Sequence, residues 1–130
     1  MIIASYPEAL GIEIETGEDG PVLRMPFTQN LLGRPNFLHG GAMAGLIELT
    51  AQAALRHALA DQAVERLSPL TVTVDYLRGG KPEEARAAAR VLRAGRRIAN
   101  VAVEIWQEDR SRPIAAARVT VRITRSGTGS

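Results

Sequence analysis

The sequence contains no cysteine, which excludes disulfide scaffolds, thiolate metal sites and cysteine nucleophiles. Aromatic residues make up only 4% of the chain, too few for a series of base-stacking side chains. The net charge is only +2, from sixteen basic and fourteen acidic residues, and no block of five like charges occurs. We therefore expect no nucleic-acid partner.

Long uninterrupted hydrophobic runs are also missing. The longest nearly uncharged stretch, residues 37–55, includes His39, Glu48 and two adjacent glycines, so it is a poor candidate for a membrane span. Residues 1–8 lack the basic start and long apolar segment of a signal peptide. These absences lead us to expect a cytoplasmic protein with no membrane partner.

The length and composition fit one domain. A chain of 130 residues buries roughly two thirds of its unfolded surface, which is enough for one sizeable core. Apolar residues make up 45% and charged residues 23%, which is typical of a folded domain. We expect a single domain over residues 1–125 and a flexible tail over residues 126–130.

One long helix is predicted between Gly41 and Asp61. This stretch is dominated by Ala and Leu and contains no proline. The first half is apolar nearly all round, which is typical of a helix enclosed by other structure. Small residues along it would let a sheet approach its backbone closely.

Alternating apolar and polar residues predict strands on both sides of the helix. The first two form a hairpin around Asp19-Gly20-Pro21, and residues 28–38 are expected to be a loop. Propensity alone favours a helix over residues 83–94, but the turn-bounded strands on either side favour a strand there. The two hairpin strands cover residues 12–15 and 23–27, and three further strands are predicted over residues 70–76, 101–105 and 119–123.

The predicted elements define an α+β fold in which an antiparallel sheet is wrapped around one central helix. Such a sheet has open edges, and strand edges are templates for pairing with another chain. Self-association is therefore expected.

The segment with the strongest chemical signal is His39-Gly40-Gly41, which leads directly into the helix. Two glycines leave backbone N–H groups uncovered at the positive end of the helix dipole, where a carbonyl oxygen or an anion can approach. Glu48 follows among apolar neighbours, and an enclosed carboxylate is costly unless it is paired or functional. Two structural alternatives remain open: a simple tight turn at the glycines, and a solvated stripe of Glu48, Gln52 and Arg56.

The segment from Asn36 to Ala42, with an acidic residue nine positions after the histidine, resembles the His-Gly-Gly motif of hotdog-fold acyl-CoA thioesterases. These are the enzymes of the phenylacetate-pathway (PaaI-like) and 4-hydroxybenzoyl-CoA group. The segment from Val74 to Gly79 is similar to the strand and loop that follow the helix in that group. The resemblance covers nearly the whole chain beyond the N-terminal hairpin, and it implies a hotdog fold and hydrolysis of an acyl-CoA.

Site roles follow from the resemblance position by position. It implies that the Gly40 N–H, with Gly41 beside it, polarises the thioester carbonyl, and that Glu48 acts as nucleophile or general base. His39 would shape the pocket wall, and Asn36 lies near the Asn or Gln that many relatives carry before the histidine, a position that is Gly33 here. In this group the active site forms between two subunits, which implies a homodimer or a homotetramer built as a dimer of dimers.

Further residues are candidates for substrate binding. Relatives use a Ser or Thr after the helix to hold water, and the ungapped match falls on Leu70, flanked by Ser68 and Thr71. Arg78 and Lys81, on either side of Gly79, would suit the phosphates of coenzyme A. The two histidines lie eighteen positions apart with no carboxylate cluster, so we expect no metal and no cofactor.

Two alternative functions fit the same fold. The segment from Glu48 to Ala54 is similar to the helix of hotdog 3-hydroxyacyl thioester dehydratases, but the position of their histidine is Arg34 here. A non-catalytic acyl-CoA-binding module is the other alternative, and it would leave Glu48 unexplained. We expect hydrolysis.

Overall fold

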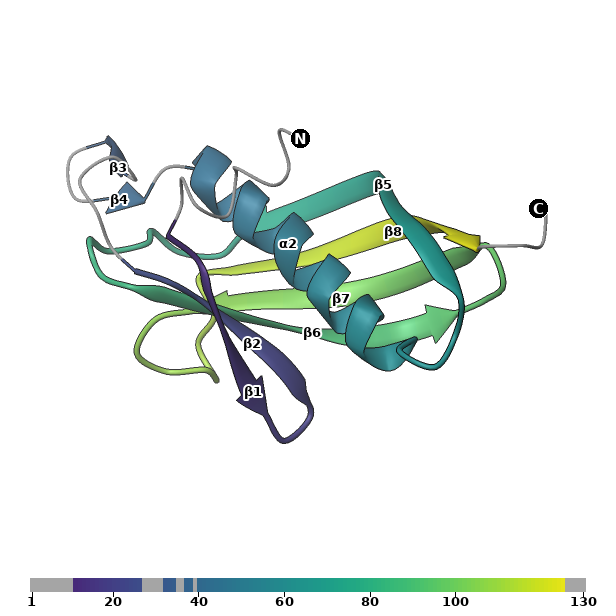
Figure 1. Cartoon of the computed structure of the whole chain (residues 1–130). Helices are drawn as coiled ribbons and strands as arrows, with labels where there is room; N and C mark the ends of the chain where they lie inside the picture. Colours follow the sequence, from purple (N-terminus) through teal and green to yellow (C-terminus); the bar gives the residue numbers. More distant parts are fainter. Residues whose placement is uncertain (1–10, 27–31, 35–36, 39, 126–130) are drawn as a thin grey trace.

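The computed structural model describes residues 11–26, 32–34, 37–38 and 40–125. The long helix α2 (Gly40–Ala58) lies diagonally across one face of a six-stranded antiparallel sheet (Figure 1). The sheet order is β1-β2-β6-β7-β8-β5, and two short strands form a separate pair before the helix. The strands of the sheet are β1 (Glu13–Gly17), β2 (Gly20–Met25), β5 (Val64–Tyr76), β6 (Ala85–Ala94), β7 (Ile98–Trp106) and β8 (Ala115–Arg125), and the short pair is β3 (Leu32–Arg34) and β4 (Phe37–Leu38).

The core lies between the inner side of α2 and the inner face of the sheet. On the helix, Leu46, Ile47 and Leu55 are completely buried. They meet alternate residues of the central strands, such as Val101 and Val121, which are also completely buried. Thr50 is the one buried polar side chain among the described residues, and its hydroxyl donates to the Leu46 carbonyl at 2.6 Å. Because no polar group is left unsatisfied there, the helix is buried at low cost.

Strand β6 confirms the prediction of a strand over a stretch with helical propensity. Its inner-face residues Ala85 and Ala87 are completely buried. Alanine is a poor strand former but a small one, so the helix backbone approaches the sheet closely here. Tertiary packing therefore overrides the local propensity for helix.

Strand β5 begins earlier than its sequence pattern predicts, because it passes through Ser68-Pro69. The strand lies at one edge of the sheet and pairs only with β8 among the described strands. Its register shifts between Pro69 and Thr71, which leaves Leu70 half exposed. Proline is tolerated at an edge strand and at a bulge, so the Ser-Pro pair bends the strand instead of ending it.

Two other expectations about boundaries are corrected by the structure. The predicted loop over residues 28–38 contains the short strands β3 and β4, which pair across a register shift. The helix ends at Ala58, three residues before the predicted end, and a turn follows in which the Gln62 N–H donates to the Leu59 carbonyl. The predicted N-terminal hairpin is confirmed, and β1 pairs with β2 from Glu13–Arg24 to Gly17–Gly20.

The hairpin turn requires its glycines. Gly20 has a φ of 121°, a conformation that other residues rarely adopt. A Cβ on Gly17 would lie 2.9 Å from the Gly20 carbonyl oxygen. Both ends of the turn are therefore restricted to glycine.

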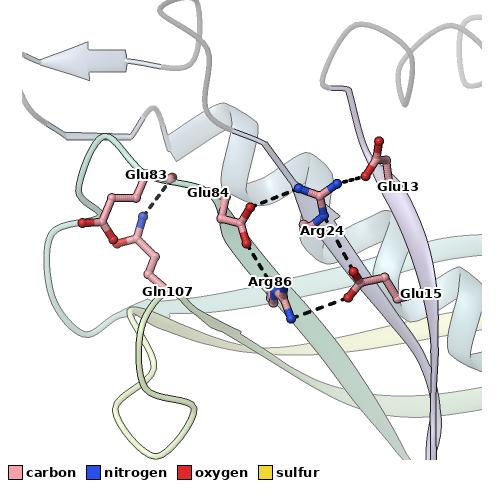
Figure 2. Close-up of polar contacts among 7 residues, drawn as sticks. All are labelled: Glu13, Glu15, Arg24, Glu83, Glu84, Arg86 and Gln107. Carbon is pink, nitrogen blue, oxygen red and sulfur yellow. Dashed lines mark hydrogen bonds and ion pairs between the residues drawn. The ribbon is translucent and has the colours of Figure 1, made fainter.

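Alternating charges join this hairpin to the start of β6 on the outer face of the sheet (Figure 2). Arg24 on β2 forms ion pairs with Glu13 and Glu15 of β1 and with Glu84, the last at 3.0 Å. Arg86 on β6 contacts Glu15 at 3.6 Å and Glu84 at 3.3 Å. The hydrogen bond from Arg24 is the main reason that the pKa of Glu84 lies below its ordinary value.

This network predicts a loss of stability in acid. A carboxyl whose pKa is lower in the folded protein contributes stability above its unfolded pKa, and loses it as the pH falls through its folded pKa. We expect the free energy of unfolding in urea to fall between pH 6 and pH 3, and to fall less in Glu84→Gln than in wild type. Glu18→Gln, in the exposed hairpin turn outside the network, should keep the wild-type difference. Equal pH dependence in all three proteins would contradict a role for Glu84.

Candidate active site

Helix α2 begins at Gly40, the first glycine of the His-Gly-Gly segment. Gly41 is exposed in the first turn, and no acidic residue lies in that turn. The positive end of the helix dipole is therefore not neutralised by a side chain of its own first turn. Such an end can stabilise the oxygen of a polarised carbonyl or an oxyanion.

Glu48 lies in the middle of α2, on the side of the helix that its own sheet covers least. Its neighbours Leu46 and Ile47 are completely buried, whereas Glu48 is half-buried. Gln52 is also half-buried and Arg56 is exposed, yet no hydrogen bond or ion pair joins these three among the described residues. The half-buried position of Glu48 therefore matches neither of the two expectations from the sequence, a fully solvated stripe of polar residues or a carboxylate enclosed by the core.

Gly40 and Glu48 of one chain are too far apart to act on one carbonyl group. Eight residues of helix rise about 12 Å at 1.5 Å per residue. A near-attack geometry needs reacting atoms about 3–3.5 Å apart. The Glu48 side chain leans toward the helix N-terminus, as all helical side chains do, but a glutamate is too short to close this gap.

Three predicted substrate-binding residues lie together at one end of the sheet. Arg78, Gly79 and Lys81 line a hollow of about 340 Å³ between the loop after β5 and the loop after β7. Arg112 adds a third cation, and the lining also includes the carboxylates of Glu83, Glu108 and Asp109. The structure therefore brings the two cations Arg78 and Lys81 to one site.

Hydrogen bonds hold these two loops together. The Gln107 side-chain amide accepts from the Lys81 N–H at 2.9 Å and donates to the Lys81 carbonyl at 2.9 Å. It also donates to the Glu83 carbonyl at 3.2 Å (Figure 2). The Arg78 guanidinium donates to the Pro113 carbonyl at 2.5 Å. Sequence reasoning missed Gln107, because a single glutamine at the end of a strand carries no motif.

The second loop is braced at Asp109. The Ser111 hydroxyl donates to the Asp109 carboxylate at 2.7 Å, and the Ser111 N–H donates to it at 2.9 Å. The hydroxyl is the main cause that keeps the pKa of Asp109 below its ordinary value. At a pH above the ordinary pKa range of an aspartate, the Asp109 carboxylate is ionised and accepts these hydrogen bonds, which hold the turn in place.

The structure does not bring Ser68 and Thr71 to Glu48. Ser68 pairs with Arg122 and Thr71 with Thr120, both on the outer face of β8, while the adjacent Leu67 is buried. The two hydroxyls therefore lie on the face of the sheet opposite α2. They are thus separated by the sheet from Glu48 of the same chain, and their role in holding water stays a prediction. His39 and Asn36 lie outside the described residues.

A second hollow, of about 810 Å³, is lined by none of the predicted site residues that the structure describes. It takes in the C-terminal part of α2 at Ala54 and His57, and the middle of strands β5 to β8. Neither Gly40 nor Glu48 lines it. Its size alone therefore does not mark the site of chemistry.

The described part of the chain contains neither a candidate metal site nor a candidate membrane-spanning helix. No group of three or more His, Asp or Glu side chains is placed there to hold a metal ion. Within the same residues, no helix is long and apolar enough to cross a membrane. That hydrolysis needs no metal stays a prediction.

Comparison with solved structures confirms the predicted hotdog fold. A thioesterase from Haemophilus influenzae, HI1161, superposes with a TM-score of 0.82 at 25% identity, over 92% of this chain and 82% of that one. The conserved protein PA5202 from Pseudomonas aeruginosa superposes with a TM-score of 0.80 at 29% identity, over 92% and 94%. The fold and the glycine-led helix thus define a hotdog-fold thioester hydrolase.

Sequence comparison gives the family. Residues 33–125 match the acyl-CoA thioesterase N-terminal domain, and the chain belongs to this family. The medium/long-chain acyl-CoA thioesterase YigI of Escherichia coli K12 is 29% identical, over 91% of this chain and 84% of its own length. The predicted class of enzyme, a thioester hydrolase, is confirmed.

Proposed function

We propose that Glu48 and the N-terminus of α2 together hydrolyse an acyl-CoA thioester. The observation that carries this proposal is that the helix starts at a glycine pair with no acidic residue in its first turn, and holds a half-buried carboxylate in its middle. The Gly40 N–H would bind the carbonyl oxygen and stabilise the charge that develops on it.

Glu48 can act in two ways. As a general base it takes a proton from water, the resulting hydroxide bonds to the carbonyl carbon, and the carbon–sulfur bond breaks. The thiolate of coenzyme A then leaves and is protonated. As a nucleophile, the carboxylate bonds to the carbonyl carbon itself, the carbon–sulfur bond breaks, and the thiolate leaves and is protonated. Water then hydrolyses the mixed anhydride, which releases the free acid and restores the Glu48 carboxylate. Both routes yield free acid and coenzyme A.

The substrate class follows from the relatives. YigI is named for medium- and long-chain acyl-CoA substrates, and we propose substrates in that range for this protein. A hydrolysis screen over acyl chains of different lengths and over aryl thioesters tests this assignment.

We expect Glu48→Gln to lower kcat by at least about a hundredfold, which is the smallest rate enhancement that a positioned general base usually contributes. The amide keeps the shape of the side chain but loses its basic lone pair. KM should change little, because most substrate contacts lie away from the carboxylate. Steady-state hydrolysis of the best acyl-CoA measures both values.

The matched control is Glu18→Gln, the same change in the exposed turn of the β1–β2 hairpin. It should keep the wild-type kcat. A Glu48→Gln enzyme with near wild-type kcat would leave the binding-module alternative ahead.

We further propose that the active unit is at least a dimer, with Gly40 and Glu48 of each site supplied by different subunits. The separation of about 12 Å along one helix supports this. So does β5, a thirteen-residue strand at the edge of the sheet, whose outer side has no partner strand among the described residues.

Mixing two inactive variants tests the shared site. Gly40→Pro removes the N–H at the first helical position, where proline is well tolerated. Gly40→Pro and Glu48→Gln should each be nearly inactive alone. After joint refolding at equal amounts, half of the dimers are hybrids with one intact site, so about a quarter of wild-type activity should return. No recovery, with hybrids shown to form, would place both residues in one subunit.

We propose that Arg78 and Lys81 bind the phosphates of coenzyme A. Lys81 has no ion-pair partner within the described residues, and Gln107 fixes its backbone on both sides. Lys81→Ala should raise KM for acyl-CoA roughly three- to tenfold and leave kcat unchanged, since a charge-assisted hydrogen bond is lost equally in ground and transition states.

A substrate without phosphates provides the control for this prediction. KM for the acyl-pantetheine thioester should be the same in wild type and Lys81→Ala, and Lys81→Arg should recover most of the affinity for acyl-CoA. An equal loss with both thioesters would contradict phosphate binding at Lys81.

A further inference from the structure

The loop between β5 and β6, residues 77–84, forms neither helix nor strand and is held against the loop between β7 and β8. The N–H groups of Leu77 and Arg78 both donate to the Ile114 carbonyl, at 2.8 Å and 3.3 Å. The Arg78 guanidinium donates to the Pro113 carbonyl of the same neighbouring loop. Backbone carbonyls of the β7–β8 loop therefore hold the first end of the 77–84 loop.

The side chain of Gln107 holds the far end of this loop. Its amide accepts from the Lys81 N–H and donates to the Lys81 carbonyl, each at 2.9 Å. The same NH₂ group donates to the Glu83 carbonyl at 3.2 Å, and Figure 2 shows this contact between the two loops. Gln107 thus uses both the acceptor and the donor of its amide on the backbone of residues 81–83.

Two glycines separate the two ends that are held. Gly79 and Gly80 stand between Arg78 and Lys81, and glycine has the largest backbone freedom of any residue. Without the Gln107 amide, rotation about these glycines would let Lys81 leave its position. The conformational entropy of that motion would then oppose the binding of a ligand at Lys81.

The surroundings of Lys81 make its position important. Its side chain is exposed at the hollow of about 340 Å³, whose lining also contains the carboxylates of Glu83, Glu108 and Asp109. Among the described residues, Lys81 forms an ion pair with none of them. A loop free to move would let the ammonium group pair with one of these carboxylates, which would compete with an anionic ligand.

We propose that Gln107 is a positioning residue that sets the preference of the enzyme for thioesters that carry phosphates. This inference rests on the proposed binding of the coenzyme A phosphates by Arg78 and Lys81. The Gln107 amide holds the backbone of Lys81, and the Lys81 ammonium group contacts the phosphate. Thioesters without phosphates do not use Lys81, so their binding does not depend on Gln107.

The test is Gln107→Met, which removes the hydrogen-bonding atoms of the side chain and keeps its length. KM for acyl-CoA should rise roughly two- to fivefold, because the released backbone of Lys81 must be ordered when the substrate binds. The value of kcat should not change, since the phosphate contact is the same in the ground and transition states. KM for the acyl-pantetheine thioester should stay at the wild-type value. Steady-state hydrolysis of both thioesters measures these constants.

A double-mutant cycle shows whether Gln107 acts through Lys81. The Lys81→Ala variant has no ammonium group to position, so adding Gln107→Met to it should not raise KM for acyl-CoA further. A side chain with a merely structural role would add its own loss to that of Lys81→Ala. Full additivity of the two losses would therefore overturn the positioning role.

Hydrogen exchange tests the contact without substrate. The Lys81 N–H donates to Gln107, so in Gln107→Met it should exchange with solvent faster than in wild type. The Ile114 N–H, which donates to the Ile105 carbonyl, should keep its wild-type rate. Exchange measured by NMR on the free enzyme gives both rates. An unchanged rate at Lys81 would show that Gln107 does not hold this loop, and would overturn the proposal.

The matched control is Gln62→Met, the same change just before the start of β5, at the opposite end of that strand from the 77–84 loop. Gln62 also uses its side chain in a hydrogen bond, which it accepts from Arg125 at 2.6 Å. This variant should keep the wild-type KM for both thioesters, and both variants should keep the wild-type circular dichroism. A similar rise in KM for acyl-CoA in Gln62→Met would overturn a specific role for Gln107.

The remaining outcomes separate this inference from the function on which it rests. If Lys81→Ala raises KM for acyl-CoA and Gln107→Met does not, phosphate binding stands and the positioning role is overturned. If neither variant raises it, phosphate binding at Lys81 is rejected, and the positioning role with it. An equal rise in KM for both thioesters in Gln107→Met would overturn the assigned preference for phosphates.

Discussion

The close packing of one helix against a sheet lined with small residues is the constraint on which the rest of this structure depends. Ala85, Ala87 and Ala99 are completely buried on the inner face, and Ala51 is completely buried on the helix. Small residues on both sides bring the two backbones near each other, and burial of Leu46, Ile47 and Leu55 supplies the hydrophobic stabilisation. Because the sheet holds the helix on one side only, Glu48 remains on the less covered side.

The sequence was sufficient to predict those elements whose local pattern agrees with their final packing. The Ala- and Leu-rich composition predicts the helix, and strands β7 and β8 show the alternation of half-buried strands. Strand β6 could be predicted only from its context, because its alanines serve the helix contact and not the strand itself. Strand β5 was predicted to begin only after Pro69, because a proline usually ends a strand. The position of β5 at the sheet edge, which the local pattern does not reveal, makes the proline acceptable inside the strand.

The candidate site divides in the same way. His39-Gly40-Gly41 and Glu48 are close in sequence, so a motif could reveal them. Gln107 and Lys81 are 26 positions apart and meet only because the loop between β5 and β6 lies beside the loop after β7. Likewise, the position of Ser68 and Thr71 on the outer face follows from the register with β8, which no local pattern gives. Contacts that depend on strand order are the ones that sequence reasoning missed.

The alternation of side chains along each strand separates the core that holds the helix from the outer surface of the sheet. Residues alternate between the two faces of each strand, so β7 uses Val101, Val103 and Ile105 to hold the helix and Ala102 and Glu104 to form the outer surface. A substitution on the outer face therefore leaves the packing that positions Glu48 unchanged. The edge of β5 differs, because its backbone is continuous with the loop that carries Arg78 and Lys81. A change in how that edge pairs would therefore reach the proposed coenzyme A site directly.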